Sequence, residues 1–271
     1  AFVPVCVGVA LGVQAIPGLA WAPGLGIFLV GLADDRWGLS WQLRLGLQFL
    51  LAALAVLGLE GSGPLLWVLG TFWLVTLINA LNMLDNMDLL SGGTAWLAGL
   101  ALFCLGCATG DPALARRALI LMAALAGFLL FNWPPARAFM GDAGSNFLGF
   151  WLGLESLRLL IPGPPAETGW RWATPLILLA LPLYDLVTVV LLRLREGRSP
   201  FQADRCHVSH RLVARGLPPL LAVASLHLLA LASGAAAVLL QLAVDWRLAA
   251  LTVGQFLAFW AAFAVVDQTR C

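Results

Sequence analysis

PLLWVLGTFWLVTLINALN, the stretch from residue 64 to residue 82, decides the fold class of this chain. It carries no charged side chain, and roughly 20 apolar residues are enough to cross a bilayer as a helix. Similar runs recur along the sequence, which is 61% hydrophobic and 11% charged over 271 residues, whereas soluble domains carry about 25% charged residues. A membrane β-barrel would need short alternating segments, which the sequence lacks. We therefore predict an all-α integral membrane protein, a polytopic helical bundle forming one domain, 1–271.

The same reading, extended to both sides of that stretch, predicts ten membrane spans. Pro, Gly and Asp residues separate them, as is usual between helices. The predicted spans are 1–16, 21–33, 42–59, 64–82, 93–109, 116–132, 146–161, 174–192, 218–241 and 247–266. The first residue, Ala1, already lies in an apolar stretch with no charged region before it, so we expect further residues upstream.

Counting spans divides the connecting segments between two sides of the membrane. One side receives segments 34–41, 83–92, 133–145 and 193–217. Ten arginines lie nearer to this side, namely Arg36, Arg44, Arg137, Arg193, Arg195, Arg198, Arg205, Arg211, Arg215 and Arg270. The five nearer to the other side are Arg116, Arg117, Arg158, Arg171 and Arg247. The excess of arginine predicts that the four segments are cytoplasmic. The net charge of +1 gives no basic surface for nucleic acid, which we exclude as a partner.

Asp34 and Asp35 end one predicted span in the motif GLADDRWGLS, residues 31–40. Two adjacent carboxylates repel each other, so either one of them serves as a base or both face a cation. A solvated helix end is the structural alternative. Because the C-terminus of a helix favours cations, two Asp residues there favour a functional role.

The fourth predicted span continues directly into INALNMLDNMDLLSGG, residues 78–93. Asn79, Asn82, Asp85 and Asp88 recur every three residues, so on a continuous helix they would follow one side and form a ladder of polar oxygens. An ionised Asp near the bilayer core costs roughly 2.5–3.5 kcal/mol, which argues against a decorative role. A polar network that only holds helices together remains the alternative.

A third motif, FNWPPARAFMGDAGSNFLGF, covers residues 131–150. Its glycines and the start of the next helix would present backbone N–H groups to an anion, while Asp142 offers a hard oxygen to Mg²⁺. A helix N-cap would explain Asp142 alone. It would not explain the flanking glycines and the neighbouring Phe139.

The fourth motif, LREGRSPFQADRCHVSHRL, covers residues 194–212 and gathers Arg and His side chains suited to phosphates. An arginine-rich cytoplasmic loop is the structural explanation, which we accept for residues 193–198. His207 and His210 are two of the three histidines of the chain. A zinc site is the weaker reading, because the two stand three residues apart without partner ligands.

Together, these motifs place carboxylates, an anion site, an aromatic ring and an Arg/His loop on one side of the membrane. Phosphoryl transfer from a nucleotide diphosphate needs this combination, because it depends on charge neutralisation and alignment. A site that opens from a hydrophobic bundle also suits a lipid substrate. A transporter would instead carry charges near the bilayer midplane and a repeated half, neither of which is visible. An inactive homologue that only binds a lipid phosphate is a third hypothesis.

The motif series resembles the polyprenyl-phosphate N-acetylhexosamine-1-phosphate transferases, which include the MraY and WecA types. The motifs that carry the resemblance are, in the order of that family, GLADDR, Arg44 with Gln48, NALNMLDNMD, AFMGDAGS, PLYD and SPFQADRCHVSHRL. The resemblance implies transfer of a sugar 1-phosphate from a UDP-sugar to polyprenyl (undecaprenyl) phosphate, releasing UMP, with Mg²⁺, or Mn²⁺ in its place. The last loop is similar to the WecA branch, which uses UDP-GlcNAc; the MraY branch, which transfers phospho-MurNAc-pentapeptide, is the alternative.

The resemblance also assigns roles by motif. Asp142 would be the metal ligand, with Asn82 as the second, and Asp34 and Asp35 would be the catalytic pair acting on the lipid phosphate. Asp88 and Phe139 would hold the uracil. The residues implied to line the sugar diphosphate are Asp85, Arg205, His207, His210 and Arg211. Arg44 and Asp185 are further candidates.

Two residues depart from the family pattern: Leu89 stands where the family has Gly, and Ser209 where it has His. Ten spans plus one upstream would give the eleven of the WecA type. The resemblance implies a multi-pass protein of the bacterial cytoplasmic membrane whose site faces the cytoplasm and serves cell-envelope glycan synthesis. It leaves open whether the chain forms a homodimer.

Overall fold

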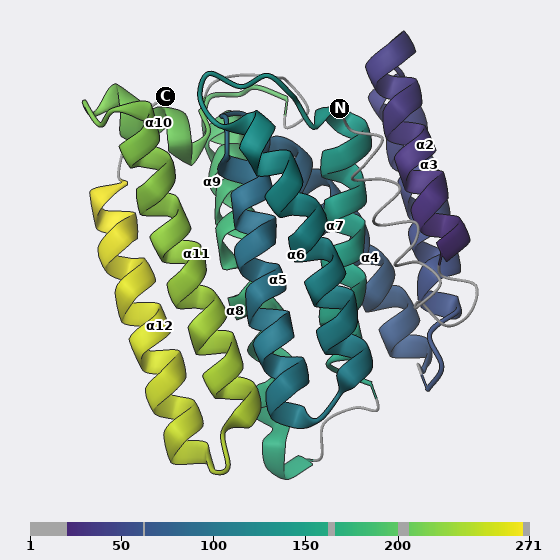
Figure 1. The fold of residues 1–271 in the computed structure, drawn as a ribbon, viewed down its shortest axis with the longest axis vertical. Helices are drawn as coiled ribbons and strands as arrows, with labels where there is room; N and C mark the ends of the chain where they lie inside the picture. Colours follow the sequence, from purple (N-terminus) through teal and green to yellow (C-terminus); the bar gives the residue numbers. More distant parts are fainter. Residues whose placement is uncertain (1–20, 62, 162–165, 200–205, 268–271) are drawn as a thin grey trace.

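A computed structural model describes residues 21–61, 63–161, 166–199 and 206–267. Its helices run roughly side by side (Figure 1). They are α2 (Trp21–Trp37), α3 (Trp41–Leu57), α4 (Pro64–Leu84), α5 (Leu90–Thr109), α6 (Pro112–Asn132), α7 (Gly141–Arg158), the 3-10 helix η1 (Ala166–Ala173), α8 (Thr174–Leu178), α9 (Ala180–Arg195), α10 (Val208–Ala214), α11 (Pro219–Leu242) and α12 (Trp246–Val266). The prediction of an all-α polytopic membrane protein is confirmed.

Several helices begin at residues that suit the first turn of a helix, where the backbone N–H groups have no partner within the helix. Proline has no N–H group there, and an Asp side chain can accept hydrogen bonds from those N–H groups. Pro64, Pro112 and Pro219 occupy first helical positions, where proline gives up no hydrogen bond. Asp111 additionally accepts hydrogen bonds from two N–H groups of α6, and Asp245 accepts one from α12. The turns between predicted spans therefore fall close to where the sequence places them.

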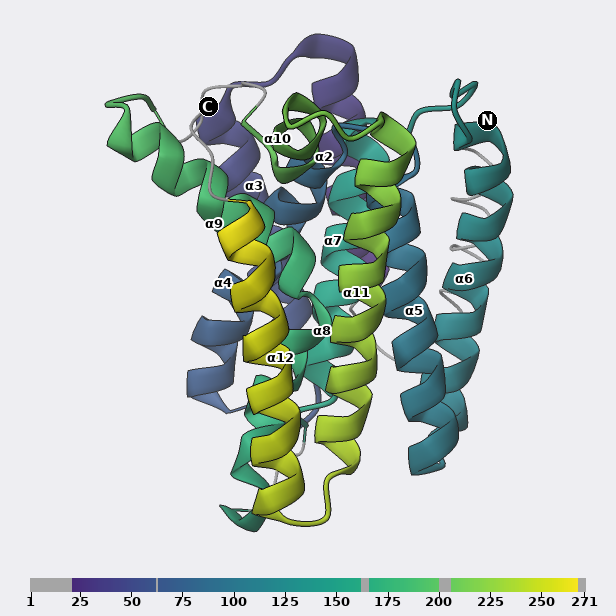
Figure 2. The ribbon, with the colours of Figure 1, turned by 90° about the vertical axis from the view of Figure 1, so that its left-hand side faces the viewer.

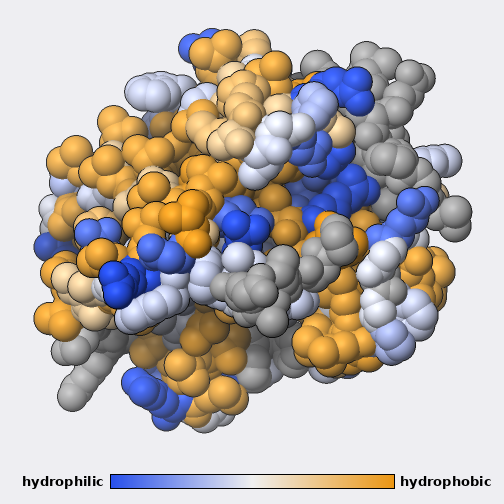
Figure 3. Space-filling model, turned by 90° about the horizontal axis from the view of Figure 1, so that it is seen from below, coloured by the Kyte–Doolittle hydropathy of each residue, from blue (hydrophilic) through white to orange (hydrophobic). Residues whose placement is uncertain are grey.

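The ten predicted spans are not confirmed as ten. Five helices, α4, α5, α6, α11 and α12, are long and apolar enough to cross a membrane, and the α8–α9 pair makes a sixth if counted as one bent span. Helix α3 is apolar but shorter, and the predicted span 1–16 lies outside the described residues. Large apolar side chains cover the outer helices, as a lipid-facing surface requires. Figure 3 shows this surface from the lower end, apolar with separate hydrophilic patches.

The predicted span 174–192 is not one straight helix, because the chain bends by 67° between α8 and α9. Leu179 leaves helical geometry at the break. Pro182 explains it, since a proline has no N–H for the carbonyl four residues earlier and its ring collides with that carbonyl. Figure 2 shows α9 leaning away from the bundle toward the end that carries α10.

Helix α7 lies at the centre of the bundle. All its residues from Ala143 to Leu157 except Phe147 are buried, mainly against α2 and α4. Gly149 permits the contact with α4, because a Cβ there would lie 2.4 Å from the carbonyl oxygen of Leu77. A helix covered by protein on every side can carry polar residues that a lipid-facing helix cannot.

The four segments predicted to share one side do lie at one end of the bundle, the upper end in Figure 1. Helices α2, α4, α6, α9 and α12 end there, and α3, α5, α7 and α11 begin there. The start of α7 is therefore surrounded by the ends of the helices that carry the sequence motifs.

Candidate active site

The first turn of α7 is capped by Asp35, which stands at the end of α2. The two Asp35 carboxylate oxygens accept hydrogen bonds from the backbone N–H groups of Asp142, at 2.9 Å, and Ala143, at 3.0 Å. Close approach of the helices requires Gly31, whose added Cβ would lie 2.5 Å from the Asp142 carbonyl oxygen. Gly141 has a φ of 65° and faces the Asp35 carboxylate. The glycine-bounded anion site expected from the sequence is thus filled by a side chain of the protein itself.

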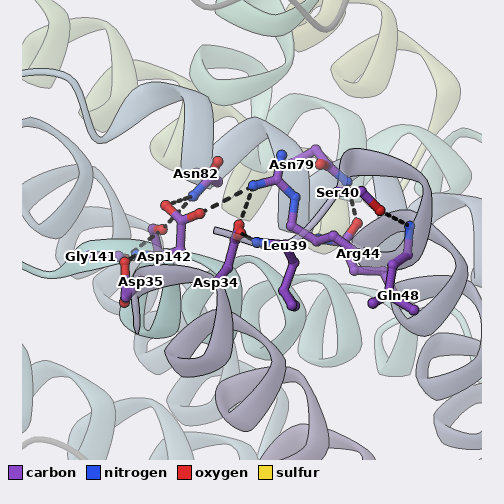
Figure 4. A network of polar contacts seen from close by, with 12 residues as sticks. Asp34, Asp35, Leu39, Ser40, Arg44, Gln48, Asn79, Asn82, Gly141 and Asp142 are labelled. Carbon is purple, nitrogen blue, oxygen red and sulfur yellow. Dashed lines mark hydrogen bonds and ion pairs between the residues drawn. The ribbon is translucent and has the colours of Figure 1, made fainter. Parts of the chain in front are cut away.

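Asp142 is held by side chains from α3 and α4. Arg44 donates from Nη1 to Oδ2 of Asp142, at 3.2 Å, and also forms an ion pair with Asp34. Asn82 donates from Nδ2 to Oδ1 of Asp142, at 2.8 Å, and to the Ser145 hydroxyl, at 3.1 Å. Figure 4 shows Arg44 reaching between the two carboxylates. The structure therefore brings together five residues that the sequence analysis took from four separate motifs, namely Asp34, Asp35, Arg44, Asn82 and Asp142.

The predicted polar ladder does not follow one helix. Helix α4 ends at Leu84, so Asn79 and Asn82 lie on it while Asp85 and Asp88 lie in the connection to α5. Asn79 lies deeper and donates to Oε1 of Gln48, at 2.8 Å, as part of the network in Figure 4. Spacing alone could not reveal this break, because Asp85 leaves helical geometry without Pro or Gly beside it.

Asp85 lies in the connection between α4 and α5, and its ionised form is disfavoured there. Burial, together with the negative charges of Asp142, Asp35 and Asp88, raises the pKa of Asp85 to about 7. No described residue donates a hydrogen bond to Asp85 in this state. The cluster around Asp142 therefore concentrates negative charge that its neighbours in the described segments do not neutralise.

Asp88 and Phe139 lie where two connections meet. Asp88 accepts a hydrogen bond from the backbone N–H of Ala136, at 3.1 Å, and the Phe139 side chain is 73% exposed. Buried Asn132, which the sequence analysis did not single out, accepts from the Leu89 N–H and donates to the Ala138 carbonyl, at 2.7 and 2.9 Å. Its only signal in the sequence is a polar side chain at the end of an apolar span, just before Trp-Pro-Pro.

Leu89, the first departure from the family pattern, has a left-handed backbone with a φ of 69°. This conformation favours glycine and strains a leucine. The Leu89 side chain is nevertheless buried in a cluster that includes Leu181 of α9 and Leu212 of α10. The chain therefore has, at this position, a backbone turn that suits glycine, and it fills the space beside the turn with an apolar side chain.

Ser209, the second departure from the family pattern, lies on α10 and links this helix to the segment between α4 and α5 that carries Asp85 and Asp88. Its hydroxyl donates a hydrogen bond to Oδ1 of Asn86. His207 donates from Nδ1 to Oδ2 of Asp185, at 2.7 Å, and its ring lies 6.3 Å from that of His210. Arg211 is buried and paired with Asp267 at the end of α12. Arg205 lies outside the described residues.

The donors around Asp142 fit a divalent cation of the Mg²⁺ type. The described residues hold no group of three or more His, Cys, Asp or Glu that could bind a metal ion without other ligands. Mg²⁺, however, usually takes one or two protein carboxylates and completes its shell with water and substrate phosphates. Asp142 supplies one oxygen, and Asn82 supplies another if its amide turns. The uncompensated negative charge beside Asp85 favours such a cation.

Comparison with known proteins agrees with this geometry. The model of the family described as glycosyl transferase family 4 matches residues 18–160, which include α2 to α7 and most of the site. The chain belongs to glycosyl transferase family 4. This family 4 chain is of the MraY/WecA type, so the resemblance is confirmed.

Three bacterial relatives illustrate the similarity. A probable undecaprenyl-phosphate N-acetylglucosaminyl 1-phosphate transferase of Bacillus subtilis (strain 168) is 27% identical over 81% of this chain and 64% of that protein. Undecaprenyl-phosphate alpha-N-acetylglucosaminyl 1-phosphate transferases of Yersinia pestis and Escherichia coli (strain K12) are 34% and 30% identical, over 79% and 70% of this chain. The chain spans 64% and 56% of the length of those two relatives.

Proposed function

We propose that this family 4 protein transfers N-acetylhexosamine 1-phosphate, specifically GlcNAc 1-phosphate, from a UDP-sugar to polyprenyl phosphate, releasing UMP at the cytoplasmic face of a bacterial membrane. The observation that carries the proposal is the placement of Asp142 between Asn82 and Arg44, beside Asp34, at one end of a lipid-facing bundle. Such a position lets a lipid phosphate and a water-soluble nucleotide meet at the same carboxylates.

The reaction exchanges one phosphorus–oxygen bond for another. An oxygen of the lipid phosphate attacks the sugar-linked phosphorus of the UDP-sugar, and the bond from that phosphorus to the bridging oxygen breaks, so the oxygen leaves with UMP. Arg44 and the Leu39 N–H, at 2.7 Å, hold the Asp34 carboxylate in a fixed orientation and in its ionised form, and we assign to it the proton of the lipid phosphate. Mg²⁺, held by Asp142 and Asn82, would supply charge neutralisation for the diphosphate.

Of the remaining candidate residues, one group would bind the uracil of the nucleotide and the other would bind the sugar diphosphate. Exposed Phe139 offers a face on which uracil can stack, and Asp88 beside it offers a hydrogen-bond acceptor to the base. His207, oriented by Asp185, and His210 on α10 would face the sugar diphosphate. Arg211 is committed to Asp267, so we assign it to holding α10 in place.

The test is release of UMP from UDP-GlcNAc by the purified protein, with and without polyprenyl phosphate. We expect UMP only when the lipid phosphate is present, together with radiolabelled GlcNAc phosphate in the lipid fraction. UDP-MurNAc-pentapeptide as the donor distinguishes the MraY-like alternative. Nucleotide binding without turnover would instead support an inactive lipid-phosphate-binding homologue, and lipid-independent transport of a solute would support a transporter.

Phe139→Ala tests the division of the site. Stacking on a base contributes about 1–3 kcal/mol, so calorimetry should show UDP-GlcNAc binding weakened by roughly ten- to hundred-fold. The KM for polyprenyl phosphate should stay nearly unchanged. The matched variant Asp34→Asn should keep nucleotide binding and lower kcat, because a base acts in the transition state. The opposite pattern in the two variants would reverse the assignment.

A further inference from the structure

Helix α10, which carries the histidine segment, is anchored at its start by a buried carboxylate of α9. Oδ1 of Asp185 accepts a hydrogen bond from the Val208 N–H and Oδ2 accepts one from His207, both at 2.7 Å. Asp185 is completely buried. This anchor fixes the start of a short helix, which the hydrogen bond from Ser209 to Asn86 also holds, but neither contact reaches its second turn.

A second buried carboxylate anchors α10 one turn later. Arg211 donates from Nε to Oδ1 of Asp267, at 3.0 Å, and from Nη2 to Oδ2. Tyr184 donates from its hydroxyl to the same Oδ2, at 2.7 Å, and Thr188 accepts from Nη2 of Arg211, at 3.2 Å. Arg211 and Asp267 are 4% and 5% exposed, so the pair is shielded from water.

Asp267 directly follows α12, a helix with few other attachments to the bundle. Along α12 the buried residues are Ala249, Thr252 and Trp260. Trp260 donates to the Ser233 hydroxyl, at 3.0 Å, and its ring packs 5.1 Å from that of Tyr184. The specific contacts of α12 are therefore concentrated toward Asp267. A helix needs no buried carboxylate to stay in lipid, and burying an unpaired carboxylate is unfavourable. Insertion in the membrane therefore does not explain why Asp267 is buried and paired.

We propose that Asp267 is a positioning residue for the reaction proposed above, because through Arg211 it fixes α10 and so places His207 and His210 at the substrate. The proposal rests on that function for its kinetic part only. His207 precedes the first residue of α10 and Arg211 follows it four residues later, so the two carboxylates hold the start of the helix and its next turn. Without Asp267, the turn that carries Arg211 loses its ion pair, and the neighbouring His210 loses its fixed position.

The first measurement is hydrogen–deuterium exchange on the full chain carrying Asp267→Asn, in detergent. We expect faster exchange in peptides covering residues 206–217 and unchanged exchange in α5. The second measurement is steady-state release of UMP. The value of kcat/KM for UDP-GlcNAc should fall about tenfold or more, since small misplacements of aligning groups are costly, while the KM for polyprenyl phosphate should stay within about twofold.

Two further variants separate positioning from general damage. Asp245→Asn lies at the opposite, exposed end of the same helix, where Asn caps as well as Asp, and should change neither measurement. Asp267→Glu keeps the charge and should recover part of the kcat/KM. If Asp267→Asn does not fold, Arg211→Gln with Asp267→Asn removes both charges of the pair and is measured in the same way.

Unchanged exchange in residues 206–217 of Asp267→Asn would overturn the anchoring of α10. Faster exchange with unaltered kcat/KM would overturn the positioning role. A wild-type protein that releases no UMP would instead remove the proposed function, and the exchange data alone would still decide whether Asp267 holds α10.

Discussion

The two ends of α7 each hold a carboxylate against arginine from a neighbouring helix, and they differ in charge balance. At the upper end, Asp142 meets Arg44, and four further carboxylates stand close by: Asp34 and Asp35 of α2, and Asp85 and Asp88 of the connection after α4. At the lower end, Glu155 meets Arg117 of α6 at 2.9 Å and Arg158 at 3.3 Å. Negative charge is in excess at the first end, whereas at the second end arginine side chains match the carboxylate.

Exposure separates the two ends further. The Asp142 side chain is 32% exposed, whereas that of Glu155 is completely buried. Both Glu155 oxygens are taken by the Arg117 Nε, at 3.0 Å each, in a paired geometry that leaves no room for a ligand. A carboxylate–arginine pair therefore stabilises the fold at the lower end, where its charges are matched and buried. At the upper end, where carboxylates outnumber cations and water can enter, the same kind of pair can form part of a functional site.

Glu155→Gln should produce the largest effect, on stability. It leaves the buried Arg117 without a counter-ion, and breaking a buried pair costs about 3–5 kcal/mol of unfolding free energy. Unfolding by SDS titration in micelles measures the loss. Activity per folded molecule should persist, because Glu155 lies at the end of α7 remote from Asp142. Arg117→Met with Glu155→Met, an apolar replacement of the pair, should cost much less than the single change; an equal cost would show that packing, not charge, holds this end.

Asp142→Asn should have the second-largest effect, and it should lower the activity without lowering the stability. The amide keeps the shape of the side chain and loses its charge, so we expect kcat to fall about 10²- to 10³-fold, as on removal of a single electrostatic contact to a reacting group. The SDS unfolding midpoint should stay at or above that of the wild-type protein. Turnover near the wild-type level at ordinary Mg²⁺ would remove Asp142 from the site.

Asp85→Asn should have the smallest effect, and in the direction opposite to Glu155→Gln. A raised pKa means that the folded chain binds the Asp85 proton more tightly than the unfolded chain does. In EDTA, the free energy of unfolding should therefore fall as the pH rises from about 4 to about 7, and stay flat above. The variant should have a shallower slope, which remains because the pKa of Asp142 is also raised, to about 6, and it should gain about 1–2 kcal/mol at pH 8 by losing like-charge repulsion. A less stable variant at pH 8 would contradict the charge imbalance.

The sequence predicted the fold where single segments determine it. Helices α3, α5 and α11 begin and end within a few residues of the ranges expected, because apolar length and turn residues are local signals. That Asp142 and Asn82 lie together was expected only from the family resemblance, which implies that both bind the metal; the pairing of Asp142 with Arg44 was not predicted.

What could not be predicted depends on which helices are neighbours. Nothing in the sequence pairs Arg117 with Glu155, because a helical period gives the face of a helix and not its partner. Asp267 follows an apolar run, and nothing in the sequence indicates that Arg211 lies against it. Pro182 is the sequence signal for the break at Leu179, but it lies within an apolar run long enough for one span.

The burial of α7 also bears on how the protein enters the membrane. Charged side chains on an inserting helix are unfavourable in lipid, and α7 carries Asp142 in its first turn and Glu155 and Arg158 in its last turn. Helices α2, α4 and α5, which pack against it, and Arg117 of α6, which neutralises Glu155, all precede it in the chain. Most of the neighbours of α7 are therefore synthesised before it, so we expect it to enter a groove in the protein and not lipid. The order of synthesis thereby allows the most polar helix of the bundle to occupy its centre.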